Sequence, residues 1–132
     1  MDRAARLQAR RVRGAAARLS GRRWEVLAAL MLMLKGYRIL GFRLKTPEGE
    51  IDLLAQRGDV LAVVEVKSRL TVEAALEAVG VEQRRRLRRA GRALAARRPQ
   101  LMRLSVRLDL IALAPHSWPR HIPDAWRDDR PR

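Results

Sequence analysis

The hydrophobic residues between positions 24 and 34 repeat with the spacing of an α-helix. Residues at i, i+3, i+4 and i+7 share one helical face, and the sequence places on this face Trp24, Leu27, Ala28, Met31 and Leu34. Three further apolar residues widen it: Val26, Leu30 and Met33. The helix is therefore expected to be largely buried. Gly36 follows and can adopt the left-handed conformation that ends many helices.

Alternating apolar residues predict three strands after this helix, at residues 37–46, 50–57 and 60–68. Gly41 interrupts the first strand, which favours a break or a bulge there. A turn at residues 47–49 precedes the second strand, and Gly58-Asp59 is a two-residue hairpin turn before the third. Such short turns between consecutive strands predict an antiparallel meander.

The second half of the chain predicts two helical segments and one more strand. Residues 72–79 favour a short helical turn, and residues 81–98 form a longer helix that Pro99 stops. Residues 104–113 alternate as a strand. Because this strand follows a helix, we expect it to join the sheet in parallel, which gives an α/β protein with a mixed sheet.

The chain divides by composition into three stretches. Residues 1–18 are rich in Ala and Arg and predict either a frayed helix or a disordered basic arm. Residues 19–114 hold all the predicted strands and helices and form a single domain, which suits a chain of 132 residues. Residues 115–132 are rich in Pro and charge and are expected to be a C-terminal tail that packs on this domain.

The overall charge of the chain is strongly positive. Lys and Arg number 29 against 14 Asp and Glu, which gives a net charge of +15, and 26 of the 29 are arginine. A positive field of this size favours a polyanionic partner, most commonly nucleic acid, with an anionic membrane surface as the alternative.

Missing residue types and a short apolar run exclude several kinds of protein. The sequence has no cysteine, so disulfides, thiolate metal sites and cysteine nucleophiles are excluded, and a reducing cytoplasm is expected. Its longest apolar run, residues 26–34, is far shorter than the ~20 residues of a membrane span. We therefore expect a soluble cytoplasmic protein with no membrane partner.

Four charged residues interrupt the two apolar strands around the Gly58-Asp59 turn: Glu50, Asp52, Glu65 and Lys67. The two-residue turn fixes the register, so that the numbers of paired residues sum to 117. This register places Asp52 opposite Glu65 and Glu50 opposite Lys67. Because side chains alternate along a strand, all four are expected to project from one face of the sheet.

Two opposed carboxylates repel one another unless a proton or a cation lies between them. Carboxylate oxygens suit Mg²⁺ or Mn²⁺, and a nearby lysine can orient a water or stabilise charge on a phosphate oxygen. The pattern therefore favours metal-assisted phosphodiester hydrolysis, with Asp52 and Glu65 as metal ligands and Lys67 as the catalytic lysine. The alternative is a structural ion-pair cluster in which Lys67 neutralises Glu50 and Glu65.

One face of the predicted helix at residues 81–98 carries five arginines: Arg84, Arg85, Arg88, Arg89 and Arg92. Like charges on one helical face repel one another. A face of this kind is typical of a surface that contacts nucleic-acid phosphates, which position a protein without reading the base sequence.

The stretch GEIDLLAQRGDVLAVVEVKSR, residues 49–69, resembles the signature of the YraN (UPF0102) family, which is related to archaeal Holliday-junction resolvases and to the PD-(D/E)XK nuclease superfamily. The spaced Asp and Glu-x-Lys of that superfamily match Asp52 and Glu65-Val66-Lys67. The resemblance runs from about Gly21 to Trp126. It implies a restriction-endonuclease-like core of helix, three strands, helix and strand, which is the order predicted above.

The resemblance also implies roles for residues near the first helix. The family opening GRRGE falls on residues 21–25, which makes Glu25 a third metal carboxylate. The neighbouring Arg22 and Arg23 join the candidate nucleic-acid-binding residues. The Val66 carbonyl is a further candidate metal ligand.

Two residues depart from the family pattern, because Trp24 replaces a glycine beside Glu25 and Gln83 replaces a lysine. Gln83 and Glu50 are candidate accessory residues of the site. The sequence thus predicts an endonuclease that uses Mg²⁺ or Mn²⁺ and grips the backbone of DNA, including branched, recombination or repair DNA. Junction resolvases of similar fold act as homodimers, and a homodimer is one arrangement open to this chain.

Two other functions stay open at this point. A non-catalytic nucleic-acid-binding module with a residual nuclease fold is the main alternative, and Trp24 and Gln83 are the residues that favour it. A weaker alternative is an interaction protein whose basic arm docks on an acidic partner or on RNA.

Overall fold

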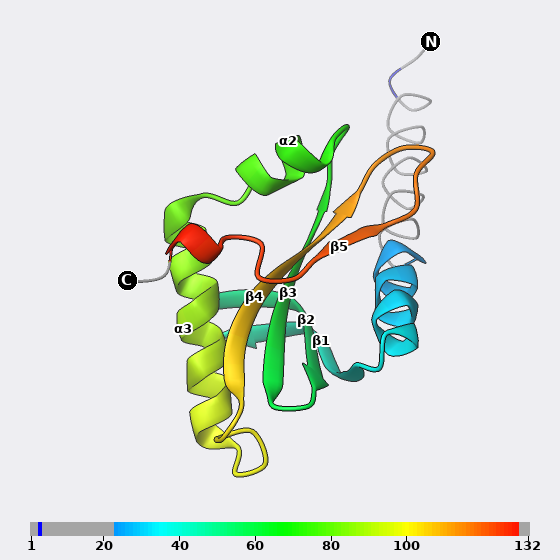
Figure 1. The fold of residues 1–132 in the computed structure, drawn as a ribbon. Helices are drawn as coiled ribbons and strands as arrows, with labels where there is room; N and C mark the ends of the chain where they lie inside the picture. The colour runs from blue at the N-terminus through cyan, green and yellow to red at the C-terminus, as the bar shows by residue number, and fades with distance from the viewer. Residues whose placement is uncertain (1–2, 4–22, 130–132) are drawn as a thin grey trace.

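The computed structural model describes Arg3 and residues 23–129. Within this part, the chain forms a helix, three strands, two helices and two strands, followed by one turn of 3₁₀-helix (Figure 1). The predicted α/β class and the order helix, meander, helix, strand are confirmed. The predicted arm at residues 1–18, apart from Arg3, lies outside the described residues, and so does Arg22.

Five strands form one mixed sheet in the order β1-β2-β3-β4-β5. Their bounds are β1 Arg38–Thr46, β2 Gly49–Arg57, β3 Val60–Ser68, β4 Ser105–Leu113 and β5 Arg120–Ile122. β1, β2 and β3 form the predicted antiparallel meander, and β4 joins β3 in parallel as predicted. β5, which the sequence did not predict, pairs with β4 in the antiparallel direction.

Helices cover both faces of this sheet and give the protein three layers (Figure 1). Residues 23–34 are helical and pack on one face. The other face is covered by α2 (Val72–Glu77) and α3 (Val81–Arg97), and the 3₁₀ turn η1 (Arg127–Asp129) follows β5. Among the described residues, no helix is both long enough and apolar enough to cross a membrane.

Side chains that alternate along the strands build a core on each side of the sheet. Leu53 and Val64 point toward the helix at residues 23–34, whereas Leu61 and Val63 point toward α3. α3 can lie close to the sheet because residue 91 is glycine. A Cβ at Gly91 would lie only 2.6 Å from a methyl carbon of Val63, so any larger residue would push the helix away.

Glycines set the turns that fix the strand register. Gly36 and Gly58 have φ angles of +90° and +58°, which are favourable for glycine, at the predicted helix end and hairpin turn. The Gly58 turn pairs Arg57 with Val60, as the register sum requires. The register between β1 and β2 shifts between Ile39 and Gly41, which confirms the predicted bulge.

The prediction that the first helix is largely buried is wrong. The residues that pack on the sheet are the small or medium-sized Ala28, Ala29 and Leu32. The exposed apolar residues are Trp24, Val26, Leu30, Met33 and Leu34, the last with 89% of its surface accessible. One sheet can contact only one side of a helix, and the apolar spacing alone did not specify which side.

A polar network attaches β5 and the residues after it to the sheet. Asp109 of β4 is fully buried and accepts hydrogen bonds from the Arg107 guanidinium at 2.8 and 2.9 Å, from the Asp124 backbone N–H at 3.0 Å and from His121 Nε2 at 2.8 Å. Lys35 donates to the other ring nitrogen of His121 at 3.0 Å. Burial alone would raise the pKa of Asp109, but these hydrogen bonds together lower it.

We expect Asp109→Ala to lower the free energy of unfolding by about 3–5 kcal/mol at neutral pH, because Arg107 loses its partner in a largely buried position. The lowered pKa of Asp109 also means that its stabilising contribution is present above about pH 4 and disappears as the pH falls further. Urea unfolding at neutral and acid pH measures both effects. Asp128→Ala, in the exposed η1 turn, is the control, and equal stabilities of the two variants would contradict the prediction.

Candidate functional site

Three of the predicted catalytic residues meet where β2 and β3 separate. The pairing of these strands follows the predicted register but ends at Leu53–Val64, one pair before the expected Asp52–Glu65 contact. The Val66 backbone N–H instead donates to Asp52 Oδ2 at 2.9 Å. The Asp52 carboxylate therefore takes the place of a backbone acceptor and reaches across to β3.

Glu65 is the most perturbed member of this cluster. Only 5% of its surface is accessible. Burial, followed by the negative charge of Asp52, raises the pKa of Glu65 to about 7. Lys67 Nζ lies 3.5 Å from Glu65 Oε1 and opposes this shift, while Gln83 of α3 donates to the same oxygen at 3.3 Å. Two carboxyl groups thus share one ammonium group.

The pKa of Asp52 is also raised. Its burial is the main cause, and the charge of exposed Glu50 adds to it. The Val66 N–H and the Lys67 ammonium oppose the shift. The predicted accessory residue Glu50 therefore acts on the cluster through its charge, without a direct contact to Glu65.

Glu25 lies near this cluster but is engaged elsewhere. Its carboxylate accepts a hydrogen bond from Arg43 Nε at 2.8 Å. The pKa of Arg43 is raised, first by this hydrogen bond and then by the charges of Glu25, Glu50 and Asp52. Arg43 is thus paired with the predicted third metal carboxylate and also feels the charge of Asp52. In the described part of the chain, no group of three or more His, Asp or Glu side chains is arranged to hold a metal.

The donor set of Asp52 and Glu65 nevertheless fits a divalent cation. Both groups offer oxygen atoms, which Mg²⁺ and Mn²⁺ prefer. Their raised pKa values show that a positive charge between them would be favourable. The Val66 carbonyl belongs to the same strand segment and remains a candidate ligand. Glu25 could join this set only by leaving Arg43.

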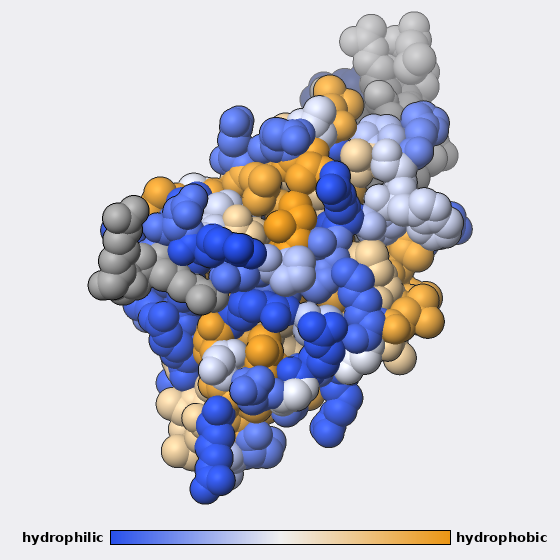
Figure 2. Space-filling model, in the orientation of Figure 1, coloured by the Kyte–Doolittle hydropathy of each residue, from blue (hydrophilic) through white to orange (hydrophobic). Residues whose placement is uncertain are grey.

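The arginines of the predicted face lie along α3, and they differ in their ion-pair partners. Figure 2 shows that hydrophilic residues cover most of the face of the molecule that includes α3. Arg84 and Arg88 bind Asp129, and Arg89 pairs with Glu48 and Glu82. Arg85 and Arg92 form no ion pair with any residue in the described part of the chain. Arg23 is exposed at the start of the described helix.

Sequence reasoning missed Arg43 and Asp129. Arg43 lies between the pairs Phe42–Leu53 and Leu44–Ile51, level with Asp52, so counting the register through the first turn as well as the second would have found it. Its φ of +47° is unusual for arginine and has no signal in the sequence. Asp129 is distant from α3 along the chain, and no local pattern connects them.

Comparison with known proteins gives consistent matches over most of the chain. Residues 24–113 match the model of a family described as "Uncharacterised protein family UPF0102". A UPF0102 protein of Caulobacter sp. is 73% identical over 117 residues, which cover 89% of this chain and 84% of that protein. A UPF0102 protein of Caulobacter vibrioides is 70% identical over 117 residues, and one of Parvibaculum lavamentivorans is 53% identical over 114 residues. These two alignments cover 89% and 86% of this chain, and 94% and 86% of the relatives.

We expect Asp52→Asn to stabilise the protein in EDTA by on the order of 1 kcal/mol, because the amide still accepts the Val66 N–H but no longer repels Glu65. The raised pKa of Glu65 makes its ionisation unfavourable for the fold, so the gain should be larger at about pH 8 than at about pH 5. Urea unfolding measures it, with the exposed Asp59→Asn as control.

In the same experiment, Mn²⁺ should stabilise the parent protein, by about 2.7 kcal/mol at a concentration one hundred times its Kd. The Asp52→Asn variant should gain little from Mn²⁺. A variant that is destabilised in EDTA, or that responds to Mn²⁺ like the parent, would instead support the structural ion-pair cluster.

Proposed function

The chain belongs to the UPF0102 family, and we propose that it is a cytoplasmic metal-dependent endonuclease that hydrolyses phosphodiester bonds in DNA. The observation that carries the proposal is the buried Glu65, whose pKa is raised to about 7 beside Asp52. Such a pair destabilises the fold without a cation, and strongly perturbed carboxyl groups of this kind are typical of catalytic sites.

The residues of the cluster have distinct roles in this proposal. Asp52 and Glu65 would hold Mg²⁺ or Mn²⁺, with Glu25 and the Val66 carbonyl as further ligands. The cation would supply charge stabilisation for the phosphate and acidify a bound water. Lys67 presents an ammonium group at the edge of the carboxylates, where it can donate to a phosphate oxygen or orient the attacking water.

Two further residues act on the carboxylate cluster, Gln83 through a hydrogen bond and Arg43 through its charge. Gln83 donates to Glu65 Oε1, which fixes one carboxylate oxygen from the side of α3. Arg43, which is level with Asp52 on β1, offers a second cation close to the site. Glu65 is thus held from α3 by Gln83, and Asp52 is held from β3 by the Val66 N–H.

The charge of the chain supports a polynucleotide substrate. A net charge of +15 attracts phosphates at long range, and the arginines of α3 can contact a backbone without reading bases. The protein would therefore recognise the structure of the DNA, including branched DNA, and would not recognise a base sequence. Paired cuts in such DNA would require a homodimer.

The alternative function is a non-catalytic nucleic-acid-binding module with the same fold. The ion pair between Glu25 and Arg43 favours this alternative. Because Glu25 is engaged with Arg43, Asp52 and Glu65 are the two predicted carboxylate ligands left for a metal in the described part of the chain. Metal binding distinguishes the two functions, since a binding module needs none.

We expect the protein to cut a labelled four-way junction, a flap or a plain duplex in Mn²⁺ or Mg²⁺, and not in EDTA. Asp52→Ala should abolish cleavage while DNA affinity stays the same or rises, because one negative charge is removed. Gel analysis of cleavage and fluorescence anisotropy of binding measure these effects. Full cleavage by Asp52→Ala would refute the site assignment, and binding without any cleavage would support the non-catalytic module.

Replacing Arg85 and Arg89 together by alanine should weaken DNA binding and reduce its dependence on salt. Each lost phosphate contact lowers the slope of log K against log salt by about 0.9, so the double variant should show a slope smaller by up to about 1.8. Arg97→Ala with Arg103→Ala removes the same charge at exposed positions farther along the chain. Equal slopes for the two double variants would mean that DNA lies elsewhere.

A further inference from the structure

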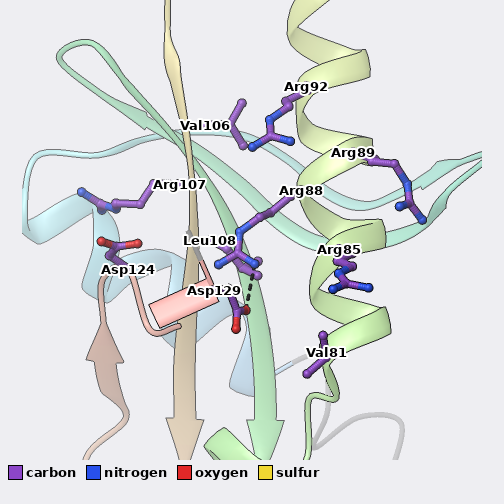
Figure 3. A pocket seen from close by; sticks show the side chains of 10 residues that line it. All are labelled: Val81, Arg85, Arg88, Arg89, Arg92, Val106, Arg107, Leu108, Asp124 and Asp129. Carbon is purple, nitrogen blue, oxygen red and sulfur yellow. Dashed lines mark hydrogen bonds and ion pairs between the residues drawn. The ribbon is translucent and has the colours of Figure 1, made fainter. Parts of the chain in front are cut away.

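A cavity of about 640 Å³ lies between α3, β4 and the segment after β5. Arginine dominates its lining, because Arg85, Arg88, Arg89 and Arg92 come from α3 and Arg107 comes from β4. Figure 3 shows Arg88 and Arg92 pointing from α3 toward Leu108 and Val106 of β4, whereas Arg89 points to the other side of the helix.

Among the described residues, the acidic ones that line this cavity are Asp124 and Asp129. Arg107 is neutralised by Asp109 outside the cavity lining, and Arg89 has partners in Glu48 and Glu82. Arg85 and Arg92 carry positive charge with no ion pair to the described residues. The cavity therefore attracts anions.

Asp129 shows what kind of anion can be held by Arg88 of the lining together with Arg84, which adjoins the lining residue Arg85 in α3. Its two oxygens accept from Arg84 Nε and Nη2 at 2.6 and 2.9 Å, which is a two-pronged contact with one guanidinium. Arg88 Nη1 donates to Asp129 Oδ2 at 2.9 Å, as the dashed line in Figure 3 shows. Arginine makes the same forked contact with two oxygens of a phosphate.

Arg84 and Arg88 each have a hydrogen-bond partner besides Asp129, whereas Asp129 belongs to a turn on the surface. Arg84 also donates to the Val79 carbonyl at 2.8 Å, and Arg88 donates to the Trp126 carbonyl at 3.0 Å. The η1 turn that carries Asp129 has no buried residue. The hydrogen bonds from Arg84 lower the pKa of Asp129 to about 2, so its carboxylate is charged at neutral pH.

The cavity is separate from the carboxylate cluster but lies close to it. Neither Asp52, Glu65 nor Lys67 lines it. However, Gln83 and Arg84 are neighbours in the first turns of α3, and Gln83 contacts Glu65 while Arg84 binds Asp129. A backbone that passes the carboxylates could therefore place another of its phosphates in the cavity.

We propose that this cavity is a phosphate-binding site for the nucleic-acid backbone and that the Asp129 carboxylate occupies the position of one phosphate until substrate displaces it. The identification of the ligand as nucleic acid rests on the proposed function. The site itself rests on the forked geometry and on the unpaired arginines beside it. Asp129 is then an internal competitor that weakens binding.

The first test compares Asp129→Asn with Asp128→Asn. Both variants remove one negative charge from the exposed η1 turn, but only Asp129 binds the arginines. Asp129→Asn should tighten binding of duplex DNA about three- to tenfold, because Arg84 and Arg88 become free, whereas Asp128→Asn should change it less than about twofold. Equal effects would show general electrostatics only, and weaker binding by Asp129→Asn would show a structural clamp. Either result overturns the proposal.

The second test needs neither DNA cleavage nor metal. Trp126 lies beside the site, with the Arg84 guanidinium carbon 5.7 Å from its ring centre, so its fluorescence reports on Arg84. In a Trp24→Phe, Trp118→Phe background, adding inorganic phosphate should change the fluorescence emission of Trp126 until the change saturates. The apparent Kd for phosphate from this titration should be lower in the Asp129→Asn variant. Chloride at equal ionic strength is the control.

The outcomes of these tests separate this inference from the proposed function. Saturable phosphate binding that duplex DNA displaces supports the site even if no cleavage is found, which would refute only the endonuclease. Phosphate binding that DNA does not displace would mean a small phosphate ligand and overturn the nucleic-acid assignment. No saturable change would overturn the site, while metal-dependent cleavage could still be observed.

Discussion

The repulsion between Asp52 and Glu65 is the constraint on which the arrangement of the site depends. The hairpin that carries them contributes apolar side chains to the cores on both faces of the sheet. Its β2–β3 pairing stops one residue pair before the two acids. The fold holds them together through one ammonium group, one amide and one backbone N–H, from Lys67, Gln83 and Val66. These contacts reduce the cost of two buried acids but leave a raised pKa on each.

Asp109 provides an internal comparison, since it is even more deeply buried than Glu65. Its hydrogen bonds come from a guanidinium, an imidazole and a backbone N–H, and its pKa falls below the usual value. Ionised Asp109 therefore stabilises the fold, whereas ionised Glu65 in the same sheet destabilises it. Burial alone thus does not single out a candidate functional acid, whereas burial beside a second acid with too little compensating charge does.

Local patterns were sufficient to predict most of the fold. The alternation of apolar residues and the Gly58-Asp59 turn specified the strands and the register that brings Asp52 near Glu65. Contacts between distant segments were not predictable in this way. The exposed side of the first helix, the short β5 and the bond between Asp129 and α3 all depend on which surfaces meet after folding. No spacing rule encodes those contacts.

The arginines of α3 show why a charge count is not a map of a binding surface. Five residues that look equivalent in the sequence divide into those that hold Asp129, one that pairs with exposed glutamates, and two with no partner among the described residues. Internal ion pairs therefore reduce the positive field that an approaching anion meets. α3 also contacts the carboxylates through Gln83, next to Arg84. The first turns of α3 therefore carry residues of both the cavity and the carboxylate cluster, so a displacement of these turns would move both.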